Sequence, residues 1–163
     1  MEKKTPSFSA TILFNVLSLG LLVGSFDIAT QLIKYFISTG KNPVIIFKYI
    51  SSGISGPGAI TDQGTNVILM GLLLHYGIAM SFTILFCLLY YRIKWMSAHK
   101  IPTGVIYALF IWSVMNLIVV PLSQTPKGPF NVLHALTELL ILILMIGLPL
   151  SFLTGRIVPV KGH

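Results

Sequence analysis

Four long apolar runs, each bounded by charged residues or by glycine and proline, dominate the pattern of hydrophobic and polar positions along the chain. They extend over residues 10–35, 65–91, 101–123 and 131–154. A bilayer core roughly 30 Å thick requires about 20 apolar residues in a helix, so each run is long enough to span a membrane. The pattern therefore predicts an all-α integral membrane protein with a single membrane domain over residues 1–163.

The connections between the runs differ in length and predict how the helices are arranged. The connections at residues 94–100 and 124–130 are short, which favours antiparallel neighbours and an up-down bundle of four transmembrane helices. The connection at residues 36–64 is longer, and its segment 43–58 joins an apolar stretch to a glycine-rich turn. We expect an interfacial or re-entrant helix there, between spans 1 and 2, in a position to cover the bundle.

Composition excludes an ordinary soluble domain, because 55% of the residues are hydrophobic and only 9% are charged. The net charge of +7 comes from basic residues at the ends of the apolar runs, and no nucleic-acid-binding motif accompanies them, so we expect a lipid bilayer and no nucleic acid as partner. One side of the predicted membrane carries seven Lys and Arg and the other side four. This bias predicts cytoplasmic termini. The first set is Lys3, Lys4, Arg92, Lys94, Lys100, Arg156 and Lys161, and the second is Lys34, Lys41, Lys48 and Lys127.

Five polar side chains within the predicted spans are the candidate site residues: Asp27, His75, Asn116, His134 and Glu138. An ionised group at the centre of a bilayer costs at least about 2.5 to 3.5 kcal/mol, so such groups usually face the interior of a bundle. At about 1.5 Å per residue, most of the five lie about 10 to 15 Å below the outer ends of their helices, and His134 lies one turn shallower. We therefore expect a polar layer in the outer half of the bundle.

Residue spacing predicts which helix faces meet at this layer. Spacings of three and four place small and polar residues on single stripes of the first two spans, and they place His134 and Glu138 on one face of the last span. Pro121 and Pro149 leave backbone carbonyls without partners in the third and fourth spans. The predicted stripes are Gly20, Gly24, Asp27 and Gln31 in the first span and Gly71, His75 and Ala79 in the second.

Three interpretations of the polar layer stay open. In the first, the layer is a hydrogen-bonded network that joins the helices of a structural or assembly subunit. In the second, it binds protons together with a small solute or ion, for transport or sensing. Asp27 and Glu138 are then the proton acceptors, His75 and His134 are the switch or the ligands, and Asn116 orients the site.

The third interpretation is a metal- or haem-binding membrane protein or enzyme. His75, His134, Glu138 and Asp27 are suitable residue types for zinc or non-haem iron, and two histidines on different helices suit a haem iron. The di-iron signature of bundles requires Glu-x-x-His from two helices, whereas this chain has a single His-x-x-x-Glu. No HExxH, CxxCH, Walker A or dinucleotide motif is present, so the sequence favours a protein that is not an enzyme and leaves a cofactor open.

Several short segments carry a resemblance to a known family. Residues 24–29, 51–56 and 72–76, together with 114–116 and 121–123, resemble small bacterial inner-membrane proteins of the YagU-like type. The resemblance implies a four-helix protein of the bacterial inner membrane, and it supplies no activity or site. Because four helices enclose little space, we also expect a homodimer or a membrane partner protein.

Overall fold

The computed structural model describes residues 10–128 and 131–157, and the described residues form helices and connecting segments. Within these ranges, four helices are long and apolar enough to cross a membrane: Thr11–Thr39, Thr65–Arg92, Lys100–Leu122 and Val132–Ile157. The prediction of an all-helical chain with four candidate membrane spans is confirmed for the described residues. Large apolar side chains such as Phe14, Leu73 and Leu109 are exposed on the spans, which suits contact with lipid tails.

The first two candidate spans are α1 (Ala10–Thr39) and α3 (Thr65–Arg92). The third is continuous through α5 (Lys100–Val114), η2 (Met115–Val119) and α6 (Val120–Leu122). The fourth is continuous through α7 (Val132–Leu142), η3 (Ile143–Gly147) and α8 (Leu148–Ile157). Three short helices complete the described part of the chain: α2 (Ile45–Ser55), η1 (Pro57–Ile60) and α4 (Lys94–Ala98).

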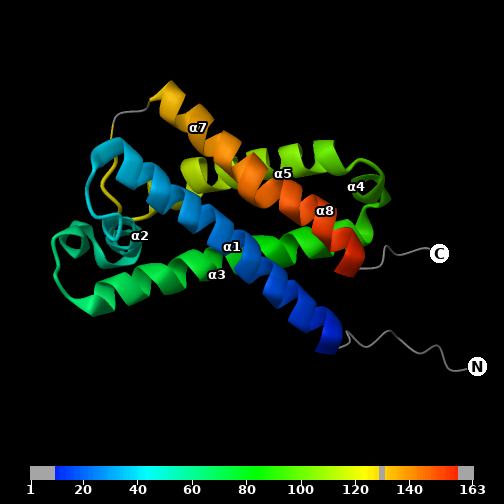
Figure 1. Cartoon of the computed structure of the whole chain (residues 1–163), viewed down its shortest axis with the longest axis horizontal. Coiled ribbons are helices and arrows are strands. Elements are labelled where there is room, and N and C mark those ends of the chain that lie inside the picture. Colours follow the sequence, from blue (N-terminus) through cyan, green and yellow to red (C-terminus); the bar gives the residue numbers. More distant parts are fainter. Residues whose placement is uncertain (1–9, 129–130, 158–163) are drawn as a thin grey trace, which may run out of the picture.

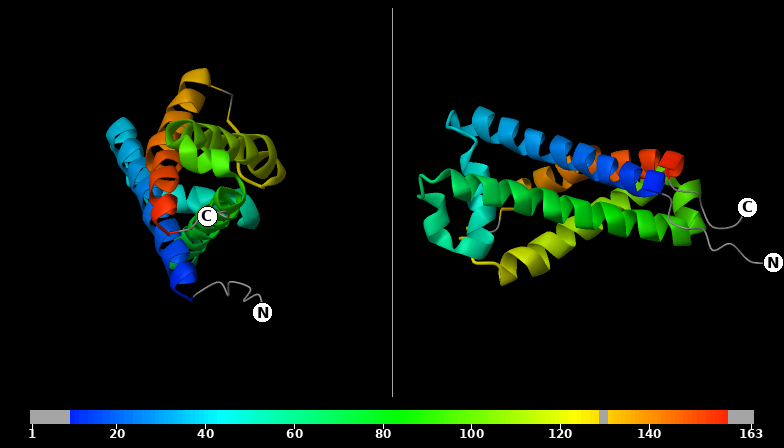
Figure 2. Two further views of the ribbon diagram at one scale, coloured as in Figure 1. Left: turned by 90° about the vertical axis from the view of Figure 1, so that its right-hand side faces the viewer. Right: turned by 90° about the horizontal axis from the view of Figure 1, so that it is seen from below.

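The two ends of the bundle differ in what lies on them. The N-terminal end of α1, the C-terminal end of α8 and the short helix α4 lie at one end, which we call the α4 end (Figure 1). Helices α2 and η1 lie at the opposite end, which we call the α2 end, and α2 runs crosswise to the long helices (Figure 2). Arg92, Lys94, Lys100 and Arg156 belong to the α4 end, whereas Lys3, Lys4 and Lys161 lie outside the described residues.

The third and fourth spans contain π-helical segments at corresponding positions before a proline. Each segment ends two residues before its proline, η2 before Pro121 and η3 before Pro149. The backbone N–H of Val120 donates to the carbonyl of Met115, and that of Leu148 donates to Ile143, so both bonds reach back five residues. A proline lacks the N–H that an α-helix would use, and the wider turn keeps each span continuous instead of breaking it.

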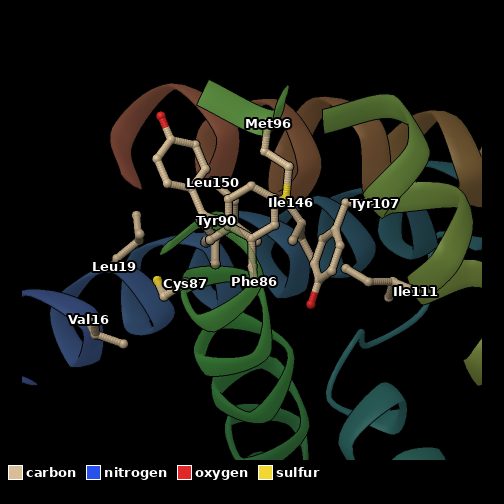
Figure 3. Packing of buried hydrophobic residues seen from close by; sticks show 11 residues of the cluster. Val16, Leu19, Phe86, Cys87, Tyr90, Met96, Tyr107, Ile111, Ile146 and Leu150 are labelled. Atoms are coloured by element: carbon tan, nitrogen blue, oxygen red, sulfur yellow. The ribbon is translucent and has the colours of Figure 1, made fainter. Parts of the chain in front are cut away.

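The half of the bundle next to the α4 end is closed by a well-packed apolar core (Figure 3). Phe86 and Tyr107 meet edge to face with their ring centroids 4.7 Å apart, and the Tyr107 hydroxyl donates to the carbonyl of Phe82 at 2.6 Å. This pairing removes both aromatic surfaces and the phenol group from lipid. The buried cluster consists of Val16, Leu19, Val23, Phe86, Cys87, Tyr90, Met96, Tyr107, Ile111, Ile146 and Leu150.

Glycines allow the long helices to approach closely. A Cβ added to Gly147 would lie 2.2 Å from the carbonyl oxygen of Gly104, so α5 and η3 touch backbone to backbone. On α1, a Cβ added to Gly24 would lie 3.1 Å from the Cβ of Ala79. The predicted small-residue stripes of the first two spans therefore touch at this point, where a larger side chain would separate the helices.

Helix α2 is fastened across its end of the bundle by backbone contacts. The carbonyl oxygen of Phe47 occupies the space beside Gly71, where an added Cβ would lie only 1.9 Å away. The side chains of Ser51 and Ser52 are fully buried. The segment that follows α6 holds the other side of α2, since Gln124 N–H donates to the carbonyl of Gly53 at 3.0 Å. Helix α2 is thus an integral part of the bundle and forms one wall of the site described next.

Candidate functional site

A cavity of about 370 Å³, which we call the deep cavity, lies among α1, α2, α3, α5, η2 and the fourth span. Its floor includes Ile111 and Ile146, which also belong to the apolar core, so the cavity ends where the packed half begins. The five candidate residues from four separate helices line this one space. They are Asp27, His75, Asn116, His134 and Glu138.

A second cavity of about 740 Å³, the mouth cavity, adjoins the first and shares Asp27, His75, His134 and Glu138 with it. It extends to Ser38, an exposed residue near the last turn of α1 at the α2 end. Helix α2 forms one side through Ile46, Tyr49 and Ile50. The two cavities together lead from the α2 end to the middle of the bundle.

Glu138 on α7 is paired with two side chains of α1. Lys34 forms an ion pair with Glu138 Oε1, and the amide nitrogen of Gln31 donates to Oε2. His134 Nε2 lies 3.8 Å from Oε1, with 67% of its side chain exposed. Sequence analysis placed His134 beside Glu138 and missed Lys34 as the counterion. The signal was present, because Asp27, Gln31 and Lys34 are four and three residues apart and therefore share one stripe.

His75 is held against the backbone of the neighbouring helix. Its Nε2 lies 2.9 Å from the carbonyl oxygen of Gly24, and since a carbonyl only accepts, the hydrogen is on Nε2. The absence of a Cβ at Gly24 is what brings α3 close enough for this bond. His75 thus joins α3 to α1 through a backbone acceptor.

Asp27 and Trp112 each contain a buried polar atom without a hydrogen-bond partner in the described part of the chain. Among the described residues, Asp27 Oδ1 and Trp112 Nε1 are both buried and neither makes a hydrogen bond. Both residues line the deep cavity. A buried polar atom without a partner is costly, so unpaired groups beside a cavity are candidates for contact with a bound species. Sequence analysis listed Asp27 and did not list Trp112, because a tryptophan in a membrane span usually serves packing.

Asn116 lies at the rim of the deep cavity and does not bridge the helices. Its amide nitrogen donates to the carbonyl of Trp112, one turn earlier in the same span, at 2.9 Å. The residue is exposed and belongs to the π-helical segment η2. Its position therefore depends on the wider turn before Pro121.

Within the described residues, no three His, Cys, Asp or Glu side chains are grouped closely enough to hold a metal ion. Glu138 is occupied by Lys34 and Gln31, and Nε2 of His75 is occupied by a backbone carbonyl. The site therefore offers a carboxylate, an indole N–H and two imidazoles around a mostly apolar space. Such a space can hold a small molecule or exchange a proton.

Comparison with known proteins gives no further guide to the site, since no protein-family model, no curated protein and no solved structure matches this chain.

Proposed function

We propose that this protein binds protons together with a small solute or ion in the cavities at the α2 end of the bundle, for transport or sensing. The observation that carries the proposal is the environment of Asp27. Its Oδ1 is buried and has no partner among the described residues, and it borders a cavity that the other candidate residues also line. A carboxylate in such a place gains more from a proton or a bound cation than a paired carboxylate does.

The roles of the other residues follow from their contacts. Glu138 is the second proton acceptor, and its carboxylate is in contact with Lys34 and Gln31. His75 and His134 are the switch or the ligands, and His134 is the more accessible of the two because two thirds of its side chain is exposed. Asn116 orients a ligand at the rim of the deep cavity.

In the membrane, we infer an up-down bundle with α2 as an interfacial or re-entrant lid and both termini in the cytoplasm. The sequence supports this orientation, since the predicted side of the termini carries seven Lys and Arg and the other side four, and cytoplasmic ends of spans are rich in basic residues. The YagU-like resemblance supports a multi-pass place in the bacterial inner membrane. The small size of the bundle favours a second copy or a membrane partner protein.

Infrared difference spectroscopy of the purified protein in lipid nanodiscs tests proton binding. The full sequence contains only four Asp and Glu, so the carboxyl bands are few. We expect a protonated carboxyl band that disappears reversibly as the pH is raised and is absent from Asp27→Asn. A band unchanged in Asp27→Asn would overturn the proposal.

Asp62→Asn is the matched control. Asp62 is the same residue type, is exposed between η1 and α3, and accepts a hydrogen bond from the backbone N–H of Gly64. It lines neither of the two cavities. The substitution removes a solvated carboxylate, and the band assigned to Asp27 should persist in it.

A structural role is the second candidate, and specific contacts favour it. The Lys34–Glu138 ion pair joins α1 to α7, and the bond from His75 to Gly24 joins α3 to α1. These contacts stabilise the bundle whether or not a ligand binds. They account for Glu138 and His75, and they leave Asp27 and Trp112 unexplained.

A further inference from the structure

The charge of the two cavities is unbalanced in favour of a cation. The charged side chains that line them in the described part of the chain are Asp27, Glu138 and Lys34. Lys34 and Glu138 neutralise each other as an ion pair, whereas the carboxylate of Asp27 has no ion-pair partner among the described residues. With His75, His134, Tyr35 and Tyr49 neutral, the lining carries one net negative charge whenever Asp27 is ionised. An anion would meet no free positive charge there.

The walls around this carboxylate are apolar and aromatic. Tyr49, Phe82 and Trp112 line the deep cavity from α2, α3 and α5, among aliphatic residues. Aromatic faces attract cations, and organic ammonium groups are bound in this way when they are removed from water. Small inorganic ions instead require several oxygen ligands that converge on one point, whereas in the described part of the chain Asp27 is the single carboxylate of the lining outside an ion pair. A volume of about 370 Å³ lies within the range of small-molecule sites.

We propose that the solute is a small monovalent organic cation with an apolar body, bound in the deep cavity by the carboxylate of Asp27 against the rings of Tyr49, Phe82 and Trp112. This inference rests on the proposed function and specifies its ligand. The cation and the proton compete for the same carboxylate, so binding of one releases the other. The mouth cavity, with the Lys34–Glu138 pair at its side, is the route by which the cation arrives from the α2 end.

The competition fixes the direction of the pH dependence. The cation binds ionised Asp27, so its affinity rises with pH while Asp27 is still protonated and becomes constant once Asp27 is ionised. In the rising range, one proton is released per cation, and the dissociation constant falls about tenfold per pH unit. Protonation of His75 or His134 adds positive charge to the same lining and acts in the same direction.

Isothermal titration calorimetry of the full chain in lipid nanodiscs provides the test, with benzyltrimethylammonium as the probe. The charge of this probe does not change with pH. Titrations in buffers of different ionisation enthalpy measure the protons released, and empty nanodiscs give the background from the lipid. Neopentylbenzene, the neutral molecule of nearly the same shape, is the control ligand. Potassium chloride tests for competition by an inorganic ion.

We expect saturable binding of the ammonium probe, release of up to one proton, and no saturable binding of neopentylbenzene. Asp27→Asn should weaken binding by at least about tenfold, because it removes the charge that attracts the cation, whereas Asp62→Asn should leave it unchanged. Trp112→Phe, which keeps an aromatic face and removes the indole N–H, should retain binding within about threefold. A thermal unfolding curve for each variant shows that it is folded.

Three results would overturn the inference: equal binding of the neutral molecule, binding that Asp27→Asn leaves intact, or complete displacement of the probe by potassium. Each of these is separable from failure of the proposed function. If the Asp27 carboxyl band still titrates in the infrared experiment, the proton site stands and only the organic cation is wrong. If the band does not titrate, the proton-binding proposal itself fails.

Discussion

The two halves of this bundle are built from the same four spans, but one half is closely packed and the other contains cavities. Next to the α4 end, Phe86 and Leu150 are fully buried and Gly104 meets Gly147 backbone to backbone. Next to the α2 end, the spans diverge around the deep and mouth cavities, and polar side chains face the space between them. The packed half holds the four spans together, so the other half can keep a cavity and an unpaired carboxylate.

The difference teaches how a small membrane bundle can tolerate costly groups. Burial of Asp27 Oδ1 without a partner lowers stability, and the cavity forfeits van der Waals contacts. Both losses of stability arise in the half next to the α2 end, and the apolar core next to the α4 end supplies the stability that offsets them. Mutations should therefore have large effects on stability in the packed half and small ones around the cavity.

The largest expected effect is that of Leu150→Ala in the packed half. Leu150 has no exposed surface, so truncation leaves a void and should lower the free energy of unfolding by about 2 to 5 kcal/mol. Leu142→Ala is the matched change at the border with the other half, where the partly buried side chain packs on the core and already borders the deep cavity, and it should cost less than half as much. Unfolding in detergent with increasing denaturant measures both values. Equal losses would contradict the contrast between the halves.

Gly147→Ala should lower the free energy of unfolding by about 1 to 3 kcal/mol, because its methyl group would clash with a carbonyl that cannot rotate away. Gly77→Ala on α3 is the control. No atom lies within 4 Å of an added Cβ there, and alanine favours a helix over glycine by up to about 1 kcal/mol. Thermal unfolding should show opposite signs for the two variants. A stabilised Gly147→Ala would show that the close approach of the backbones is not required.

The smallest effects should occur among the polar residues of the cavity. Glu138→Gln leaves Lys34 without its charged partner and should lower the free energy of unfolding by about 1 kcal/mol. This value is expected for a partly exposed ion pair, and here 29% of the Lys34 side chain and 23% of the Glu138 side chain are exposed. Asp27→Asn should leave stability unchanged or raise it, because it replaces a carboxylate that lacks a partner. Unfolding curves recorded at neutral pH measure the stability of the Glu138→Gln and Asp27→Asn variants. A large loss in Asp27→Asn would favour the structural role of the polar layer.

Much of the fold was predictable from the sequence because lipid allows few choices. Apolar runs of about 20 residues must be helical where no water can bond to the backbone. The predicted ranges therefore match the four candidate spans closely, although α1 continues to Thr39 and not only to residue 35. The π-helical segments were not predicted, since a proline indicates a missing hydrogen bond and does not indicate how the helix compensates for it.

The sequence predicted which residues line the site better than it predicted which partners those residues bind. Spacing along each helix placed Asp27, His75, Asn116, His134 and Glu138 at similar depths, and all five line one cavity. The partners of these residues depend on how the helices are rotated and how closely they cross, which spacing does not determine. For that reason His75 bonds to the carbonyl of Gly24, and Glu138 bonds to Lys34 and Gln31.

The sequence by itself determined that this chain belongs in lipid, how many candidate spans it has, and which polar residues lie in the same layer. These properties follow from the apolar length of each run and the period of the helix, both of which are local. Only the tertiary structure decided which polar groups neutralise each other and which stay free. Lys34 reaches Glu138, and Asp27 and Trp112 have no partner among the described residues, because pairing depends on distances between helices far apart in the chain.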